Sequence, residues 1–145
     1  MKWILIVGVA LIGLVALMTA IGALLPRTHV ASRTLRVART PQEVWLVFEQ
    51  VTAAASVPVD IIENDPPRRL VTRVKPTEKM FGGTWTCTAA PAPGGSTLTI
   101  VEDGWVANPF FRFMSRFVIG HHATIDSTLE QIARALNEQP SLSGE

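Results

Sequence analysis

Glu102 and His121 are the two polar residues that interrupt otherwise apolar patterns in the second half of the chain. Glu102 ends an alternating run that contains Leu98 and Ile100, and His121 falls on a stripe of apolar residues spaced three and four apart. A carboxylate and an imidazole that share one pocket can orient a ligand or transfer a proton. The structural alternatives are a solvated strand end for Glu102 and a hydrogen-bonded core histidine for His121.

A second candidate for acid–base chemistry is the pair His122 and Asp126, which are four residues apart and can meet on the flank of a helix. A His–Asp pair acts in catalysis only together with a nucleophile. The nearby hydroxyls belong to Ser115, Thr124 and Ser127, and no sequence motif marks any of them as that nucleophile. We therefore predict no catalytic residue from the sequence.

The sequence also predicts neither a metal nor a cofactor. His121 and His122 would point about 100° apart on a helix. The single cysteine, Cys87, excludes a Cys-rich metal site and an intramolecular disulfide, and it fits a small buried hydrophobe. Gly82-Gly83 lacks the lysine and hydroxyl of a phosphate-binding loop.

Residues 3–25 form a run without a charged side chain, and this run indicates that the protein is attached to a membrane. As a helix it would be roughly 34 Å long, against a hydrocarbon core of about 30 Å. We predict an uncleaved transmembrane anchor over residues 1–26. A cleavable signal is the first alternative, since Ala20 and Ala23 are small; a buried core helix, the second, would normally carry a polar face.

Charge near the ends of this run predicts its orientation. Lys2 precedes it, whereas Arg27, Arg33, Arg36 and Arg39 follow it soon after, so the C-terminal domain is expected in the cytoplasm. The net charge is only +1, with acids and bases interspersed, which argues against nucleic acid as a partner. The chain then has room for one domain over residues 27–138, followed by a disordered tail over 139–145.

The pattern predicts one strand, one helix and four further strands before the C-terminal region. Thr40, Pro41 and Glu43 form a capping signature, so a helix is expected to begin there and end near residue 55, after a strand over 29–37. Strands over 57–63, 69–74, 83–89 and 97–106 are separated by turn-forming residues. They predict an antiparallel meander with one apolar face.

Asn108 and Pro109 predict the start of a long C-terminal helix that runs to about residue 136 and lies on the sheet. Only Gly120 interrupts it. The apolar stripe of this helix comprises Phe110, Phe113, Met114, Phe117, Ile125, Leu129, Ile132 and Leu136.

Several short motifs follow one another in order along the domain. They are His29-Val30, Thr40-Pro41-Gln42-Glu43-Val44-Trp45, Asp65-Pro66-Pro67-Arg68-Arg69-Leu70-Val71, Phe81-Gly82-Gly83-Thr84-Trp85-Thr86, Thr97-Leu98-Thr99-Ile100-Val101-Glu102-Asp103-Gly104, Asn108-Pro109-Phe110-Phe111-Arg112-Phe113 and Gly120-His121. In this order and spacing the chain resembles the SRPBCC superfamily, the helix-grip fold of START-like lipid-binding domains and polyketide cyclase/dehydrase proteins. The resemblance covers nearly everything after residue 26.

The chain departs from the SRPBCC pattern in one place. Members usually have two more strands between the first long helix and the strand before Asp-Pro-Pro, and residues 52–56 here join that helix almost directly to residue 57. The resemblance then implies an α+β helix-grip fold with five strands in its antiparallel sheet. One edge of the sheet would be open, and a second copy of the chain is one candidate to cover it.

The resemblance also implies a cavity between the sheet and the C-terminal helix that holds an apolar or amphipathic molecule. We expect it to be lined by Trp85, Ile100, Glu102, Met114, Phe117 and His121, with ordinary core packing as the alternative for the apolar members. The leading prediction is a membrane-anchored module that binds a hydrophobic or lipid-like ligand. The alternatives are a cyclase/dehydrase-like enzyme with His121 and Glu102 as acid and base, an interaction subunit that pairs through its open sheet edge, and a shortened non-functional copy of a longer protein.

Overall fold

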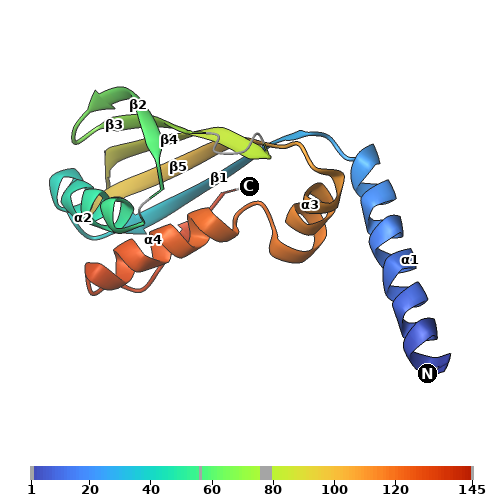
Figure 1. Ribbon diagram of the computed structural model, residues 1–145. Helices are drawn as coiled ribbons and strands as arrows, with labels where there is room; N and C mark the ends of the chain where they lie inside the picture. The colour runs from blue at the N-terminus through green and yellow to red at the C-terminus, as the bar shows by residue number, and fades with distance from the viewer. Residues whose placement is uncertain (1, 56, 76–79, 145) are drawn as a thin grey trace.

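A computed structural model of the chain describes residues 2–55, 57–75 and 80–144. Its α+β architecture agrees with the prediction: helices α2 and α4 cover one face of an antiparallel sheet, and α1 stands at the far end (Figure 1). The elements in chain order are α1 (Lys2–Leu24), β1 (Thr28–Val37), α2 (Pro41–Ala54), β2 (Val59–Asp65), β3 (Arg69–Val74), β4 (Phe81–Ala92), β5 (Gly95–Val106), α3 (Pro109–Met114), the π-helical turn η1 (Ser115–Ile119), α4 (Ala123–Ala135) and β6 (Leu142–Ser143).

Helix α2 begins at the predicted capping residues. The Thr40 hydroxyl accepts a hydrogen bond from the backbone N–H of Glu43 at 3.3 Å, and the Glu43 carboxylate accepts one from the backbone N–H of Thr40 at 2.9 Å. This reciprocal pair satisfies two donors that a helix start leaves unbonded. The bonds from the backbone and side chain of Thr40 also lower the pKa of Glu43.

The strand register brings residues of three strands to one position on the helix-covered face. The strand order is β2-β3-β4-β5-β1-β6, and Glu102 of β5 lies between Ala31 of β1 and Trp85 of β4. Directly paired residues point to the same side of a sheet. The predicted apolar face is confirmed, because Cys87 and Ile100 on it are buried.

The hydrophobic core fills the space between this face and helices α2 and α4. From α4, Ile125, Leu129 and Ile132 are fully buried, as the predicted stripe requires. Burial of each such side chain is worth about 1.5–3 kcal/mol. Other buried apolar side chains of this core include Leu35, Val44, Trp45, Phe48, Leu98 and Ile100.

The prediction of one long C-terminal helix is wrong. Asn108 does cap a helix, since its side-chain oxygen accepts bonds from the N–H groups of Phe110 and Phe111 at 2.9 and 3.3 Å. That helix, α3, passes into η1 and ends at Gly120, whose φ of +85° lies in the left-handed region that glycine tolerates best. The chain then turns, and α4 begins anew at Ala123.

The sheet has six strands among the described residues, so the predicted count of five is wrong. The sixth, β6, pairs Leu142 and Ser143 with Leu35 and Thr34 of β1, within the segment expected to have no structure. A backbone bond from Arg36 N–H to the Ser141 carbonyl extends the pairing. At the opposite edge β2 pairs only with β3 among the described strands, and a register shift interrupts it between Ile61 and Glu63.

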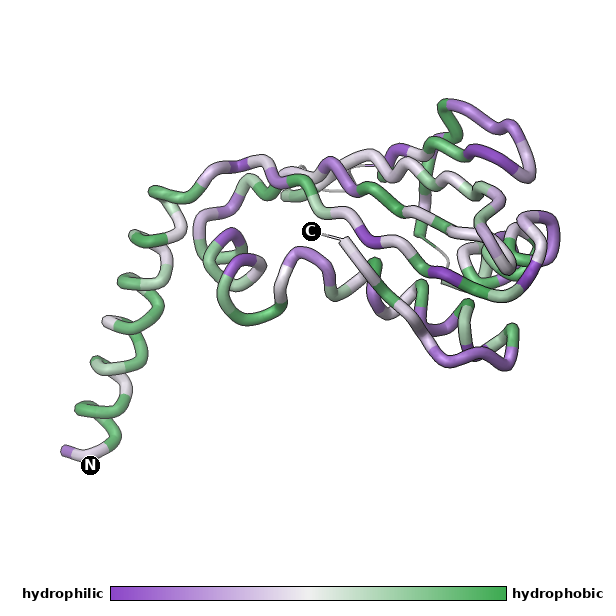
Figure 2. The backbone as a smooth tube through the Cα atoms, turned by 180° about the vertical axis from the view of Figure 1, so that it is seen from behind, coloured by the Kyte–Doolittle hydropathy of each residue, from purple (hydrophilic) through white to green (hydrophobic). Residues whose placement is uncertain are grey.

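Helix α1 is long and apolar enough to cross a membrane, and the apolar window that defines this span is unburied in the structure. Figure 2 shows its hydrophobic colouring along nearly the whole length. Its C-terminal end packs against α3, where Gly22 is buried against the Pro109 carbonyl. Arg112 of α3 is also buried there, and its guanidinium donates to the carbonyls of Leu25 at 2.9 Å and Ala107 at 3.0 Å.

Candidate ligand-binding site

Glu102 is the centre of a polar cluster at the α1-proximal end of the sheet. Its carboxylate accepts a hydrogen bond from the indole N–H of Trp85 at 2.9 Å and lies 3.3 Å from Nε2 of His29. The His29 and Glu102 side chains are 16% and 21% exposed, so water still reaches both. The solvated strand end that was the alternative for Glu102 is therefore replaced by a part-buried, bonded carboxylate.

The space for the His29 ring exists because residue 104 is a glycine. A Cβ at position 104 would lie 2.6 Å from Cε1 of His29 and 3.2 Å from Oε1 of Glu102. Gly104 is paired with His29 on β1 and with Gly83 on β4. Gly83 and Gly104 lie opposite each other and carry no side chains. The His29 ring can therefore lie close to the sheet backbone, at the border between the apolar face and the polar cluster.

His121 lies over this cluster and connects it to η1. Its ring stacks on His29 with 4.1 Å between centroids and 20° between planes, and its Nδ1 lies 3.0 Å from the Ser115 hydroxyl. Burial lowers the pKa of His121, and the charges of His29 and Arg116 lower it further. A neutral ring can accept a hydrogen bond from the Ser115 hydroxyl at Nδ1.

The cluster of His29, Trp85, Glu102, Ser115 and His121 is called the polar cluster below. Glu102 has more lone pairs than its two protein partners use, and the hydroxyl and imidazole groups can both donate and accept. This combination suits a ligand with a hydroxyl or amine at one end. Among the described residues no three His, Cys, Asp or Glu side chains are arranged to hold a metal ion.

The structure brings three of the six predicted pocket residues together and separates the others. Trp85, Glu102 and His121 belong to the polar cluster, whereas Ile100 is fully buried in the core. Met114 is part-buried on α3. Phe117 is 59% exposed, because the break at Gly120 removes the single helical face that would have turned it toward the sheet.

Sequence reasoning missed His29 and Ser115. A signal for His29 was present: it precedes Ala31 by two residues, and therefore shares the inward face of β1 with Ala31 and Leu35. No comparable signal marks Ser115, since its approach to His121 depends on the turn at Gly120. The pairing of His122 with Asp126 that their spacing allows is not among the described contacts, where Asp126 instead accepts a bond from Arg33 Nε at 2.9 Å.

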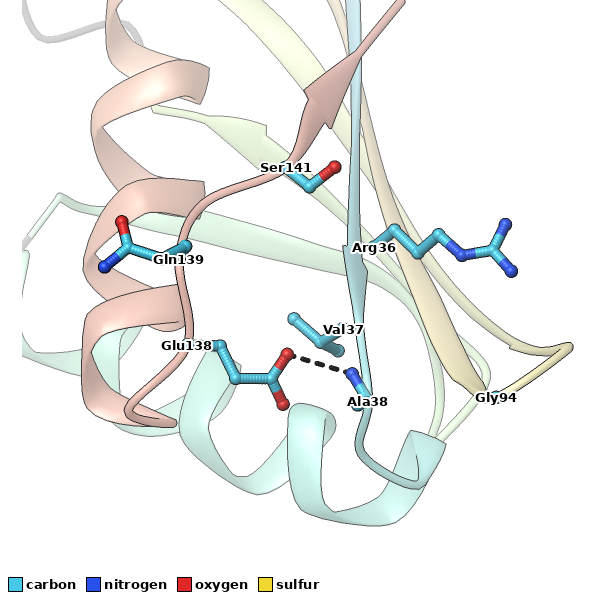
Figure 3. A pocket seen from close by; sticks show the side chains of 7 residues that line it. All are labelled: Arg36, Val37, Ala38, Gly94, Glu138, Gln139 and Ser141. Carbon is cyan, nitrogen blue, oxygen red and sulfur yellow. Dashed lines mark hydrogen bonds between the residues drawn. The ribbon is translucent and has the colours of Figure 1, made fainter.

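A separate hollow of about 380 Å³ opens on the surface at the other end of α4. Figure 3 shows the Glu138 carboxylate at its side, where it accepts a hydrogen bond from the backbone N–H of Ala38 at 2.9 Å. None of the predicted pocket residues lines it, and α4 separates it from His121 by about 20 Å of helix. The lining residues are Arg36, Val37, Ala38, Gly94, Glu138, Gln139 and Ser141.

Comparison with known proteins places the fold among solved structures from bacteria. A protein of Mesorhizobium loti aligns with a TM-score of 0.57 at 13% identity, covering 77% of this chain and 97% of its own. Proteins of Rhizobium leguminosarum (TM-score 0.51, 13% identity, 74% of this chain and 97% of that one) and Rhodobacter sphaeroides (0.50, 15%, 74% and 89%) align similarly. At this identity the likeness concerns the fold alone. No protein-family model and no curated protein matches the chain.

Proposed function

We propose that the protein is a membrane-anchored module that binds a small hydrophobic or lipid-like molecule. The observation that supports this most is the polar cluster itself: five side chains that bond or stack with one another at the end of an apolar sheet face, beside the helix that can cross a membrane. A ligand of this class would present its polar end to Glu102 and Ser115. Its apolar body would lie toward Trp85 and Met114.

The anchor and its orientation are part of the proposal. In it, α1 remains uncleaved and the domain lies in the cytoplasm, because the arginines that follow the helix outnumber the positive charges before it. The buried contact of Gly22 with Pro109 and the bond from Arg112 to the Leu25 carbonyl support retention of α1, since cleavage would expose these groups.

We also infer that the domain is a shortened helix-grip fold of the SRPBCC superfamily. Strand β1, helix α2, the β2–β5 meander and a C-terminal helix on the sheet follow in the order that the resemblance implies. Helix α2 ends at Ala54 and β2 begins at Val59, which leaves room for only a short link in place of two strands. The remaining strands are still neighbours, because β1 pairs directly with β5.

The ligand-binding proposal is tested by titrating a fluorescent long-chain amine, which carries the kind of polar end that the cluster suits, into the full-length protein held in lipid nanodiscs, with empty nanodiscs as background. Glu102→Gln is expected to weaken binding because it removes the charge that accepts from Trp85 and His29. The matched control is Glu63→Gln, a carboxylate on β2 that pairs with Arg69 away from the cluster. Equal affinity in both variants and in the wild type would contradict the proposed site.

A second candidate function is catalysis of the cyclase or dehydrase kind. The 3.0 Å approach of Ser115 to a histidine with a lowered pKa favours it, because proton transfer needs such a pair. Glu102, however, bonds to His29 and Trp85 and not to His121. Turnover of a bound ligand that is lost in Ser115→Ala and retained in Ser127→Ala would favour this candidate.

A third candidate is assembly of two copies through the β2 edge. Ile61 and Ile62 on this strand are 63% and 52% exposed, and an edge strand presents unpaired backbone groups. The register shift beside Glu63 opposes such pairing, because irregular edges pair poorly. Cross-linking between chains that carry Ile61→Cys, absent for Leu46→Cys, would favour assembly.

A further inference from the structure

The π-helical turn η1 ends in three consecutive apolar residues that project from the protein. Phe117, Val118 and Ile119 are 59%, 61% and 63% exposed; they are called the η1 patch below. In a regular helix three consecutive residues point about 100° apart, so they seldom all face solvent on a helix that packs against a domain. The end of η1 at Gly120 and the turn into α4 leave all three outward.

This patch is held beside the end of α1. Phe117 contacts Phe113 with 4.9 Å between ring centroids, and the backbone nitrogen of Phe113 lies 3.3 Å from where a Cβ on Gly22 would be. Arg112 bonds to the Leu25 carbonyl from the same short helix. Figure 1 shows α3 beside the C-terminal half of α1, with which it is in contact, and η1 continues directly from α3.

The chain segment that contains the patch carries charges of one sign only. No acidic residue occurs between Asp103 and Asp126, whereas Arg112 and Arg116 lie inside this interval. Arg116 is exposed and directly precedes Phe117. Arg112 is buried, so Arg116 is the basic side chain of this segment that can reach lipid headgroups, and an apolar surface next to an exposed basic side chain suits the boundary of a bilayer with anionic lipids.

We propose that the η1 patch inserts into the interfacial layer of the same bilayer that α1 crosses, with Arg116 at the lipid headgroups. The contact is a second attachment that fixes the orientation of the domain and brings the polar cluster close to the membrane surface, since Ser115 and His121 flank the patch. This inference depends on the anchor role of α1 and is independent of ligand binding.

Val118→Cys and Leu46→Cys in the full-length protein test this placement. Leu46 is a matched control because it is 60% exposed and lies on α2, at the end of the domain away from α1. The natural Cys87 is buried and stays unlabelled. Each variant is labelled with an environment-sensitive fluorophore and reconstituted into vesicles of equal parts phosphatidylcholine and phosphatidylglycerol, with and without bromine on the acyl chains.

The proposal predicts a blue shift and strong quenching by brominated lipid at position 118 and neither effect at position 46. Adding Arg116→Gln is expected to reduce the quenching at 118. Equal emission at both positions in protein that floats with the vesicles would overturn the patch alone, while failure of both variants to float would overturn the anchor as well. A disulfide between two Val118→Cys chains at high lipid dilution would assign the patch to a second copy and also overturn the proposal.

Discussion

The rings of His29 and His121 stack on each other, although His29 is the second residue of β1 and His121 lies just before α4. On one side His29 approaches the Glu102 carboxylate, and on the other His121 approaches the Ser115 hydroxyl. The stack therefore links the sheet to η1 through polar side chains. It lies at the end of the domain where α1 is followed by β1.

Protonation of His121 should weaken the fold. Its pKa is lowered by burial and by neighbouring positive groups, so the folded state binds fewer protons than the unfolded state below about pH 6.5. Stability contributed by neutral His121 is thus present above that pH and is lost as the pH falls. Thermal unfolding of the full-length protein in detergent should show this loss, and His121→Leu should reduce it; an unchanged pH dependence in the variant would contradict the assignment.

His121→Leu also tests the role of this residue in binding. The variant places an apolar side chain of similar reach over His29, so we expect it to fold while its uptake of a fluorescent long-chain amine changes. Circular dichroism checks the fold, and titration checks uptake. Unchanged uptake by the folded variant would remove His121 from the site.

Trp85→Phe isolates one hydrogen bond of the polar cluster. The phenyl ring retains most of the apolar contact, but the indole N–H that donates to Glu102 is lost. Because Trp85 is only part-buried, we expect a loss of about 1–2 kcal/mol in the free energy of unfolding. Denaturant titration measures it, with Trp105→Phe, on the opposite face, as the comparison; equal losses would show that the bond to Glu102 contributes nothing specific.

Gly22→Ala should separate α1 from α3. The new methyl group has no space beside the Pro109 carbonyl, whereas a methyl group at Gly13 would meet nothing within 4 Å. Hydrogen exchange at the amides of α3 should therefore accelerate in Gly22→Ala and remain at the wild-type rate in Gly13→Ala. Identical exchange in the two variants would contradict the described packing.

Cys87 should be unreactive in the folded protein. Burial raises the pKa of its thiol to about 12, and only the thiolate reacts readily with alkylating reagents. Iodoacetamide at pH 8 should label the denatured chain fully and the native chain very slowly, as mass spectrometry can show. Rapid native labelling would mean that β4 and its neighbours open locally.

Patterns within one element predicted most of the fold, and contacts between elements account for what they missed. Thr40 and Glu43 meet over one helical turn, so their spacing alone fixed the start of α2. Gly120 was visible as an interruption, but a glycine can be tolerated inside a helix, and its positive φ is a result of the turn that brings His121 to His29. The exposure of Phe117 follows from that same turn.

Strand β6 was missed for a related reason. Leu142 and Ser143 carry little strand pattern of their own, and they pair because β1 presents an open edge beside Leu35. Alternation placed Glu102 and Trp85 each on the apolar face of its own strand. Their hydrogen bond also requires the register between β4 and β5, which cannot be read from the sequence. Three of the predicted pocket residues consequently meet through partners that only the folded chain supplies.

Native mass spectrometry of the full-length protein, released gently from detergent, tests the central claim most directly. Binding of a hydrophobic ligand at the polar cluster predicts a monomer that carries a defined lipid-like mass, which Glu102→Gln reduces and Glu63→Gln does not. An empty dimer, or a complex with another chain, would contradict it and would point instead to the β2 edge as the functional surface.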